Sequence, residues 1–126
     1  MPGLTLDTGA LIALERREAR AAQVFAVSAR NRVPITVPTV VIGQWWRGQR
    51  GPLWRDISAA VDLEPLDAVL ARIAGDALAR SGTSDIVDAV VVASAAQRGD
   101  VVYTSDVGDL RRIAEAAFPS VRVLGV

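Results

Sequence analysis

Short apolar runs suited to β-strands alternate with helix-patterned segments from one end of the chain to the other. Parallel strands need crossover connections, which are usually helices, so this alternation favours a parallel sheet with helices on both faces. At 126 residues the chain is long enough to bury one real core and too short for two. We therefore predict an α/β fold with three α/β/α layers and a parallel five-stranded sheet, formed by residues 1–126 as a single domain.

The expected elements follow from periodicity and from turn residues. Strands are predicted at residues 3–6, 34–37, 60–63, 101–103 and 121–124. Helices are predicted at residues 10–15, 17–31, 38–47, 54–58, 67–80, 85–98 and 107–117. Gly51-Pro52 is expected to form a turn before the short fourth helix, and Gly82 and Gly99 are expected to end the fifth and sixth helices.

Three residue types are missing, and their absence narrows the chemistry. The chain has no Cys and no His, and all fourteen of its basic residues are Arg. Disulfide frameworks, thiol nucleophiles, Ser-His-Asp sites, His metal ligands and Schiff-base lysines are therefore excluded. Carboxylate chemistry remains, with help from Arg, Ser, Thr and backbone groups.

Charge and hydropathy add little about partners. Fourteen acidic residues balance the fourteen arginines, so net charge gives no argument for or against nucleic acid. The first residues lack a cationic segment followed by a long apolar run, and no run approaches 18 apolar residues. We expect no signal peptide, no membrane association and a cytoplasmic location.

Aspartates stand where strands end and helices begin. Asp7 follows the first strand, Asp85 and Asp88 open the sixth helix, and Asp106 and Asp109 follow the fourth strand. Ligands of open α/β sheets bind beyond the carboxyl ends of the strands. Each Asp alone is also explained as a helix cap, because caps need acceptors and favour negative charge. Capping does not explain why four or five such residues gather at one edge of a neutral domain.

A group of aspartates at one edge needs a cation. Like charges at short range repel and raise one another's pKa unless a cation neutralises them. An all-oxygen acidic group suits Mg²⁺ or Mn²⁺ rather than zinc or copper. Such an ion can activate water for phosphodiester hydrolysis without histidine or lysine, so we predict a metal-dependent phosphodiesterase site.

Three segments resemble the signature blocks of the PIN domain family, and more narrowly of VapC-type toxins of bacterial toxin-antitoxin pairs. They are the segments 6–14 (LDTGALIAL), 84–95 (SDIVDAVVVASA) and 102–110 (VYTSDVGDL). The resemblance extends over essentially the whole chain. It implies a Mg²⁺- or Mn²⁺-dependent endoribonuclease that cleaves RNA, is inhibited by a cognate antitoxin protein and is usually a homodimer.

The resemblance also assigns site residues. Asp7, Asp88 and Asp106 match metal-binding aspartates of the family, with Asp85 a competitor for the central position and Asp109 the acid that often follows. The polar pair Thr104 and Ser105 matches residues thought to touch a metal-bound water or phosphate. We also expect Thr8, Arg111 and Arg112 to contact the substrate, although the two arginines could equally form a solvated helix face.

One position departs from the family pattern. The family normally carries a Glu in its helix at the segment matching 39–47, where this chain has Gln44. An amide oxygen can still orient water or ligate a metal, but it carries no charge and cannot act as a base. Either Asp7, Asp88 and Asp106 suffice for catalysis, or the chain is a catalytically impaired PIN-like binding module that acts through protein or RNA binding.

A tryptophan- and arginine-rich stretch follows this position. Trp45, Trp46 and Trp54 interleave with Arg47, Arg50 and Arg55. Adjacent residues cannot share a helix face, so we expect one of Trp45 and Trp46 in the core and the other at an interface, in preference to stacking on RNA.

Two other α/β classes are less consistent with the sequence. A phosphoacceptor receiver domain needs a lysine after its last strand, and this chain has none. A nucleotide-binding domain needs a Gly-rich loop after its first strand, where this chain has Asp7-Thr8-Gly9.

Overall fold

The computed structural model describes residues 2–48 and 51–126, and it is a parallel α/β structure. In chain order its elements are β1 (Leu4–Leu6), α1 (Thr8–Glu15), α2 (Ala19–Arg30), β2 (Ile35–Pro38), α3 (Thr39–Trp45), α4 (Gly51–Ala60), β3 (Asp62–Glu64), α5 (Ala68–Ser81), α6 (Ile86–Arg98), β4 (Val101–Thr104), α7 (Gly108–Ala117) and β5 (Val123–Gly125). No helix among these residues has the length and apolar character needed to cross a membrane.

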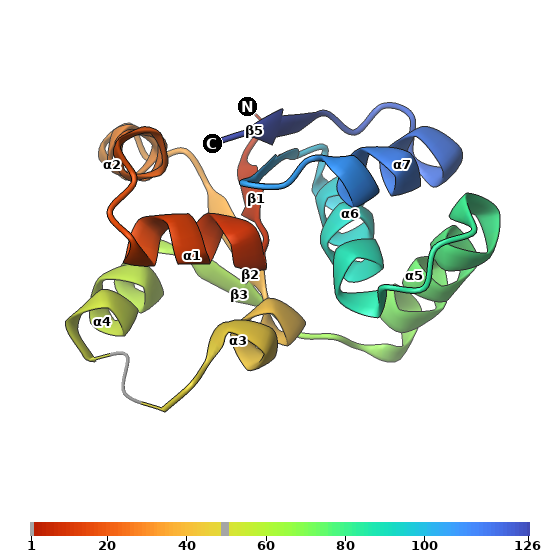
Figure 1. Ribbon diagram of the computed structural model, residues 1–126, viewed down its shortest axis with the longest axis horizontal. Helices are drawn as coiled ribbons and strands as arrows, with labels where there is room; N and C mark the ends of the chain where they lie inside the picture. The colour runs from red at the N-terminus through yellow and green to blue at the C-terminus, as the bar shows by residue number, and fades with distance from the viewer. Residues whose placement is uncertain (1, 49–50) are drawn as a thin grey trace.

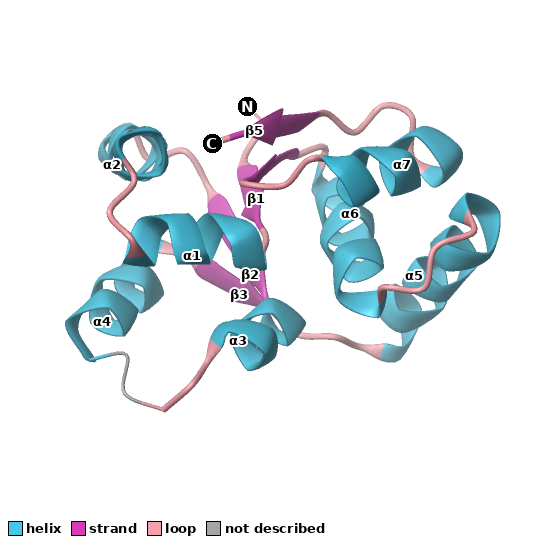
Figure 2. Ribbon diagram, in the orientation of Figure 1, coloured by secondary structure: helices cyan, strands magenta, loops and turns pink. Residues whose placement is uncertain are grey.

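The five strands form one sheet in the order β3-β2-β1-β4-β5, with every neighbouring pair parallel. Figure 1 shows α1, α2 and α4 on one side of the sheet and α5, α6 and α7 on the other. Figure 2 shows the strands as a narrow band between these two groups of helices. The predicted parallel five-stranded sheet between two helical layers is confirmed.

Helix α6 forms the centre of one helical layer. Residues 89–95 are all buried, and the helix packs against β1, β2 and β4 as well as α5 and α7. A helix that is apolar around most of its circumference has to be enclosed on several sides. This packing fixes the start of α6, and with it Asp85 and Asp88, relative to the ends of the central strands.

Most differences from the predicted elements are shifts of one to three residues at element ends. The exception is Gly51-Pro52, where the predicted turn is wrong because both residues lie in the first turn of α4. Proline is tolerated there because the first helical N–H groups have no partner within the helix. Helix α4 then continues to Ala60, which moves β3 to Asp62–Glu64 instead of the predicted 60–63.

A partly buried ionic network is centred on the buried Asp100, which directly precedes β4 at the end of the sheet where that strand begins. The Asp100 carboxylate accepts hydrogen bonds from the Gly3 N–H (3.1 Å) and the Thr5 hydroxyl (2.9 Å), and it pairs with Nε of Arg98 (2.9 Å). The Arg98 guanidinium also pairs with Glu64 at 3.2 Å and donates to Thr5 at 3.0 Å. This network ties β1, β3 and β4 to the last turn of α6.

Candidate metal centre

Asp7 occupies the carboxyl end of the central strand β1. It is the N-cap of α1, and Oδ1 accepts a hydrogen bond from the Ala10 N–H at 2.9 Å. Its other oxygen, Oδ2, accepts a hydrogen bond from the Thr104 hydroxyl at 2.6 Å, which joins the ends of β1 and β4. Asp7 is only 7% exposed, so its carboxylate is held in one orientation with little access to water.

Thr104 organises the turn that follows β4. Its Oγ1 accepts a hydrogen bond from the Asp106 N–H at 3.0 Å and lies 3.0 Å from the Asp106 carbonyl oxygen. The Asp106 side chain accepts a hydrogen bond from the Gly108 N–H at 3.3 Å and is exposed. Thr104 therefore positions both Asp7 and the backbone of Asp106, a role that sequence reasoning did not assign to it.

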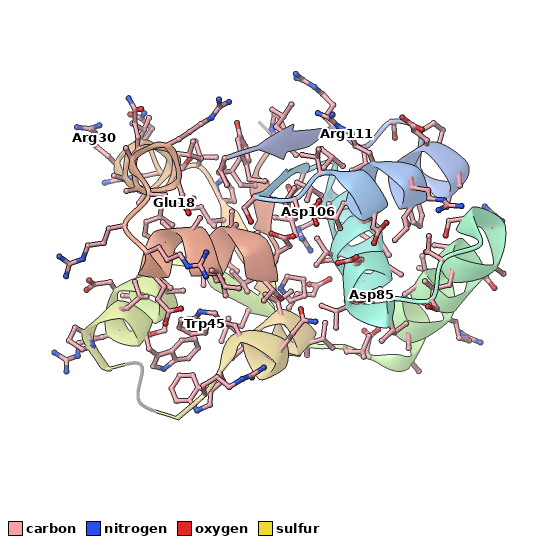
Figure 3. All side chains as sticks on the ribbon, in the orientation of Figure 1. Glu18, Arg30, Trp45, Asp85, Asp106 and Arg111 are labelled. Atoms are coloured by element: carbon pink, nitrogen blue, oxygen red, sulfur yellow. The ribbon has the colours of Figure 1, made fainter. Side chains whose placement is uncertain are left out.

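The start of α6 contributes two more carboxylates. Asp85 is the N-cap of α6, and its Oδ1 accepts a hydrogen bond from the Asp88 N–H at 3.1 Å. Asp85 is exposed, whereas Asp88 is half-buried in the first turn. Figure 3 shows Asp106 after β4 and Asp85 at the start of α6. Asp85 uses Oδ1 to cap α6, and the half-buried Asp88 experiences the charges of the other acids.

Burial and mutual repulsion raise the pKa of two of these carboxyls. Desolvation is the main cause of the raised pKa of Asp7, opposed by its hydrogen bonds from Thr104 and Ala10 and reinforced by the charge of Asp106. The pKa of Asp88 rises to about 7, first through desolvation and then through the charges of Asp85, Asp7, Asp109 and Asp106. The other four predicted acidic residues therefore all lie within electrostatic range of Asp88.

The donor chemistry of this group fits a hard divalent cation. Its members are carboxylates, no described arginine forms an ion pair with them, and a cation would relieve both the desolvation and the repulsion. In residues 2–48 and 51–126, however, no three acidic side chains are already close enough together to hold a metal ion. The five carboxylates thus form a negatively charged region whose donor atoms suit a hard divalent cation. Two of its members, Asp106 and Asp109, are exposed side chains.

Gln44 stands at the border of this region, on α3. Its side-chain carbonyl accepts a hydrogen bond from the hydroxyl of Thr8, the residue after Asp7. Helix α3 packs against α1 and α6 and carries no acidic residue. The side of the site formed by α3 is therefore neutral.

Gly9 was not recognised from the sequence as a site residue. A Cβ atom placed on Gly9 would lie 2.5 Å from Oγ of Ser105 and 3.4 Å from Oγ1 of Thr104. The first turn of α1 therefore approaches the end of β4 as closely as it does because this position has no side chain. A glycine two residues after a strand-end aspartate was the available sequence signal.

The predicted substrate-binding arginines lie on α7. The Arg111 guanidinium donates to the Val123 carbonyl oxygen from Nε (3.3 Å) and Nη2 (3.1 Å), which attaches α7 to β5. Arg112 is exposed. Both arginines are exposed, and Arg111 differs from Arg112 in that its guanidinium is also hydrogen-bonded to β5 in this structure.

The three tryptophans form one aromatic cluster beside the site. Trp45 is buried, as predicted for one member of the adjacent pair, whereas Trp46 is 39% exposed. The ring centroids of Trp46 and Trp54 are 5.4 Å apart and those of Trp45 and Trp46 are 6.1 Å apart, both in edge-to-face arrangements. Arg50 of the same predicted strip lies outside the described residues.

Solved structures with this fold cover nearly the whole chain. They include VapBC2 from Rickettsia felis bound to a DNA fragment from its promoter, with 12% identity, a TM-score of 0.72 and 98% coverage of both chains. DNA-bound VapBC from Salmonella typhimurium has 18% identity and a TM-score of 0.71 over 99% of this chain and 98% of that one. FitAcB from Neisseria gonorrhoeae has 14% identity and a TM-score of 0.65, with 96% coverage of both chains. At these identities the likeness establishes the fold.

Sequence comparison establishes the family. No curated protein matches the chain, but the PIN domain family model matches residues 4–116. The match begins with β1 and ends within α7, so it includes Asp7, Asp88 and Asp106. The resemblance of the three signature segments is thereby confirmed, and the chain belongs to the PIN domain family.

Proposed function

We propose that this protein is a metal-dependent endoribonuclease that acts as the toxin of a type II toxin-antitoxin pair. The observation that carries the proposal is a group of five aspartates at the carboxyl ends of β1 and β4 and at the start of α6. Asp7 and Asp88 are desolvated, and no arginine among the described residues forms an ion pair with the group. Keeping such a group without a counter-ion is unfavourable, so its presence favours a bound divalent cation.

In this proposal Asp7, Asp88 and Asp106 hold Mg²⁺ or Mn²⁺, assisted by Asp85 or Asp109. When bound, the ion supplies a water of lowered pKa and neutralises charge that develops on the phosphodiester. Asp7 contributes a ligand of fixed orientation, since both of its oxygens already accept hydrogen bonds from the protein. In this proposal Thr104 holds that orientation, Ser105 and Arg112 contact the RNA strand, and Thr8 lies on the same side of the site.

The family and the fold support a proposal about the partners. The similar solved structures are VapBC and FitAB complexes, and VapB- or FitA-like chains are the model for a cognate antitoxin here. We propose that this chain pairs with such an antitoxin, forms a homodimer and acts on RNA in the cytoplasm.

A second candidate function has its own support. Gln44 replaces the family Glu, and no three described acids are already assembled around a metal position. These two observations favour a PIN-like module that binds RNA or protein and has lost cleavage. The two candidates differ in whether divalent metal produces cleavage.

The test is cleavage of a mixed RNA pool by the purified, antitoxin-free chain in Mg²⁺, in Mn²⁺ and in EDTA. We expect cleavage only with metal, and we expect Asp7→Asn to reduce the rate about a hundredfold or more, because a metal ligand contributes several kcal/mol to the transition state. Asp76→Asn, an exposed aspartate on α5, is the matched control and should cleave normally.

Two outcomes would contradict the nuclease. Cleavage that persists in EDTA or in Asp7→Asn would remove the metal site from the mechanism. RNA binding without cleavage, combined with cleavage gained in Gln44→Glu, would establish the binding module instead.

A further inference from the structure

Gln44 is the one site position at which this chain replaces the family's acid with an amide, and the structure shows how that amide is held. Its side-chain carbonyl accepts a hydrogen bond from the Thr8 hydroxyl, 36 residues away in sequence. Thr8 is the first residue of α1 and follows Asp7, so the contact places the amide of α3 beside the carboxyl end of β1. The residue is otherwise exposed.

The hydrogen-bonding capacity of an amide then determines what Gln44 can offer. An amide has one acceptor oxygen and an NH₂ group with two donors. The oxygen is engaged by Thr8, and within residues 2–48 and 51–126 no acceptor is hydrogen-bonded to the amide nitrogen. The amide oxygen keeps a second lone pair, so what distinguishes Gln44 from a glutamate at this position is its pair of N–H donors, which have no acceptor among the described residues.

Charge makes a donor useful at this point. Asp7, Asp85, Asp88, Asp106 and Asp109 give the site a strongly negative potential, and an RNA strand is a polyanion. A glutamate on α3 would add to the repulsion, whereas a neutral amide does not. The acceptors that RNA carries in every nucleotide are its phosphate oxygens and its ribose 2′-hydroxyl, and both match an NH₂ donor.

We propose that Gln44 is a substrate-binding residue that donates to the RNA backbone through an amide oriented by Thr8, and that it does not ligate metal. Thr8 is then a positioning residue that acts through Gln44. The inference rests on the proposed function only in taking RNA as the ligand, because binding and cleavage are measured separately.

The experiment separates metal affinity from RNA affinity. Mn²⁺ affinity is measured by titration calorimetry without RNA. RNA affinity is measured by fluorescence anisotropy with a labelled, mixed-sequence single-stranded RNA in Mg²⁺. For this assay alone, every variant is made in the Asp7→Asn background so that the RNA stays intact. Gln23→Ala, which removes an exposed amide on α2, is the matched control.

We expect Gln44→Ala to weaken RNA binding about three- to tenfold, the usual effect of one hydrogen bond, and to leave Mn²⁺ affinity within about twofold. Gln44→Glu should weaken RNA binding further, since it adds a like charge. Thr8→Val should weaken RNA binding by about threefold and Thr8→Ser should restore it, because only the hydroxyl orients the amide. Gln23→Ala should change neither affinity.

Several results would overturn the inference. A tenfold loss of Mn²⁺ affinity in Gln44→Ala would make Gln44 a metal ligand, and unchanged RNA affinity in that variant would make it a solvated side chain. Absence of RNA binding by the Asp7→Asn parent would overturn this inference, whereas the proposed function is tested separately by cleavage with the unaltered chain. Absence of cleavage, with the expected changes in RNA affinity, would contradict the nuclease and leave the role of Gln44 standing.

Discussion

Two buried aspartates lie at opposite ends of the strands of the same sheet, and their surroundings differ in the charged residues beside them. Asp7 is 7% exposed and Asp100 is 6% exposed, and each accepts hydrogen bonds from a backbone N–H and a threonine hydroxyl. Asp100, where the strands begin, also pairs with Arg98. Asp7, where the strands end, has no described arginine beside it and faces Asp88 and Asp106 instead.

The comparison separates a structural carboxylate, Asp100, from one that we propose to be functional, Asp7. The charge of Asp100 is compensated within the protein, so that site is complete without a ligand. The charges around Asp7 are compensated only when something outside the chain supplies a cation, because burial and like charge both oppose ionisation there. Burial of a carboxylate alone therefore does not indicate a functional site, whereas a buried carboxylate whose charge is not balanced by a cationic side chain does.

The largest effect on stability should appear at Asp100. Asp100→Asn would place an NH₂ group against the donors of Thr5 or Arg98, and we expect a loss of about 3 kcal/mol in the free energy of unfolding. Asp7→Asn should leave stability within about 1 kcal/mol, because Asn caps helices well and its NH₂ can donate to Thr104 once that hydroxyl turns toward the Asp106 carbonyl. Urea unfolding of both variants measures the difference, and equal losses would end the distinction between the two aspartates.

The two glycines nearest these aspartates provide the next test. A Cβ on Gly3 would lie 2.6 Å from the Pro34 carbonyl oxygen, whereas a Cβ on Gly9 would meet the Ser105 hydroxyl, the end of a mobile side chain. We expect Gly3→Ala to destabilise by about 2 kcal/mol, because backbone has to move, and Gly9→Ala by less than about 1 kcal/mol. Gly9→Ala should instead reduce cleavage by displacing Ser105, and full activity with lost stability would contradict that assignment.

A smaller effect should come from pH in the absence of metal. Asp88 keeps its proton up to about pH 7 in the folded protein and loses it near 3.8 when unfolded, so the folded state binds more protons between these values. Stability should therefore be highest near pH 4 and should fall as pH rises through 7, by about 1–2 kcal/mol once solvent screening of the half-buried group is allowed for. Thermal melts in EDTA measure this slope. Asp88→Asn should reduce this slope to the part that the raised pKa of Asp7 contributes, and an unchanged slope in that variant would assign it to another group.

The smallest effect should be stabilisation by Mg²⁺. A ligand at ten times its dissociation constant raises the free energy of unfolding by about 1.4 kcal/mol if it binds only the folded state. We expect this increase at pH 8, less of it at pH 5.5 where Asp88 holds a proton, and none in Asp7→Asn. Asp100 does not belong to the site, so a mild change in its hydrogen-bond partner, Thr5→Ser, should keep the full stabilisation by Mg²⁺. Loss of that stabilisation in Thr5→Ser would show that the two ends of the sheet are coupled.

The fold was largely predictable because its signals are local. Apolar runs followed by aspartate located the ends of β1 and β4, and Gly82 and Gly99, both with positive φ, end α5 and α6 as expected. The turn predicted at Gly51-Pro52 failed because the same two residues suit a turn or a first helical turn, and only the packing of α4 decides between them.

The acidic members of the candidate site were also readable, whereas the groups that orient them were not. Strand ends indicated Asp7 and Asp106, and a helix start together with the family resemblance indicated Asp88, without any knowledge of contacts. The hydrogen bond from Thr104 to Asp7, the Thr8–Gln44 contact and the network of Arg98, Asp100 and Glu64 join residues distant in sequence. One sequence contains no pattern that pairs such positions, because each partner is equally plausible as a surface residue.

The hydrogen bond between Thr104 and Asp7 links residues 97 positions apart, and β1 lies between β2 and β4 in the sheet. Strand β1 must therefore wait for β4 before the site exists. A nascent chain that has reached the end of α6 already carries Asp7, Asp85 and Asp88, but it has neither Thr104 nor Asp106. Long-range pairing of this kind is slow to form, so the site is complete only after β4 and the turn that follows it have been synthesised and folded. For the proposed ribonuclease, topology would delay the first turnover until residues 104–106 have joined the sheet.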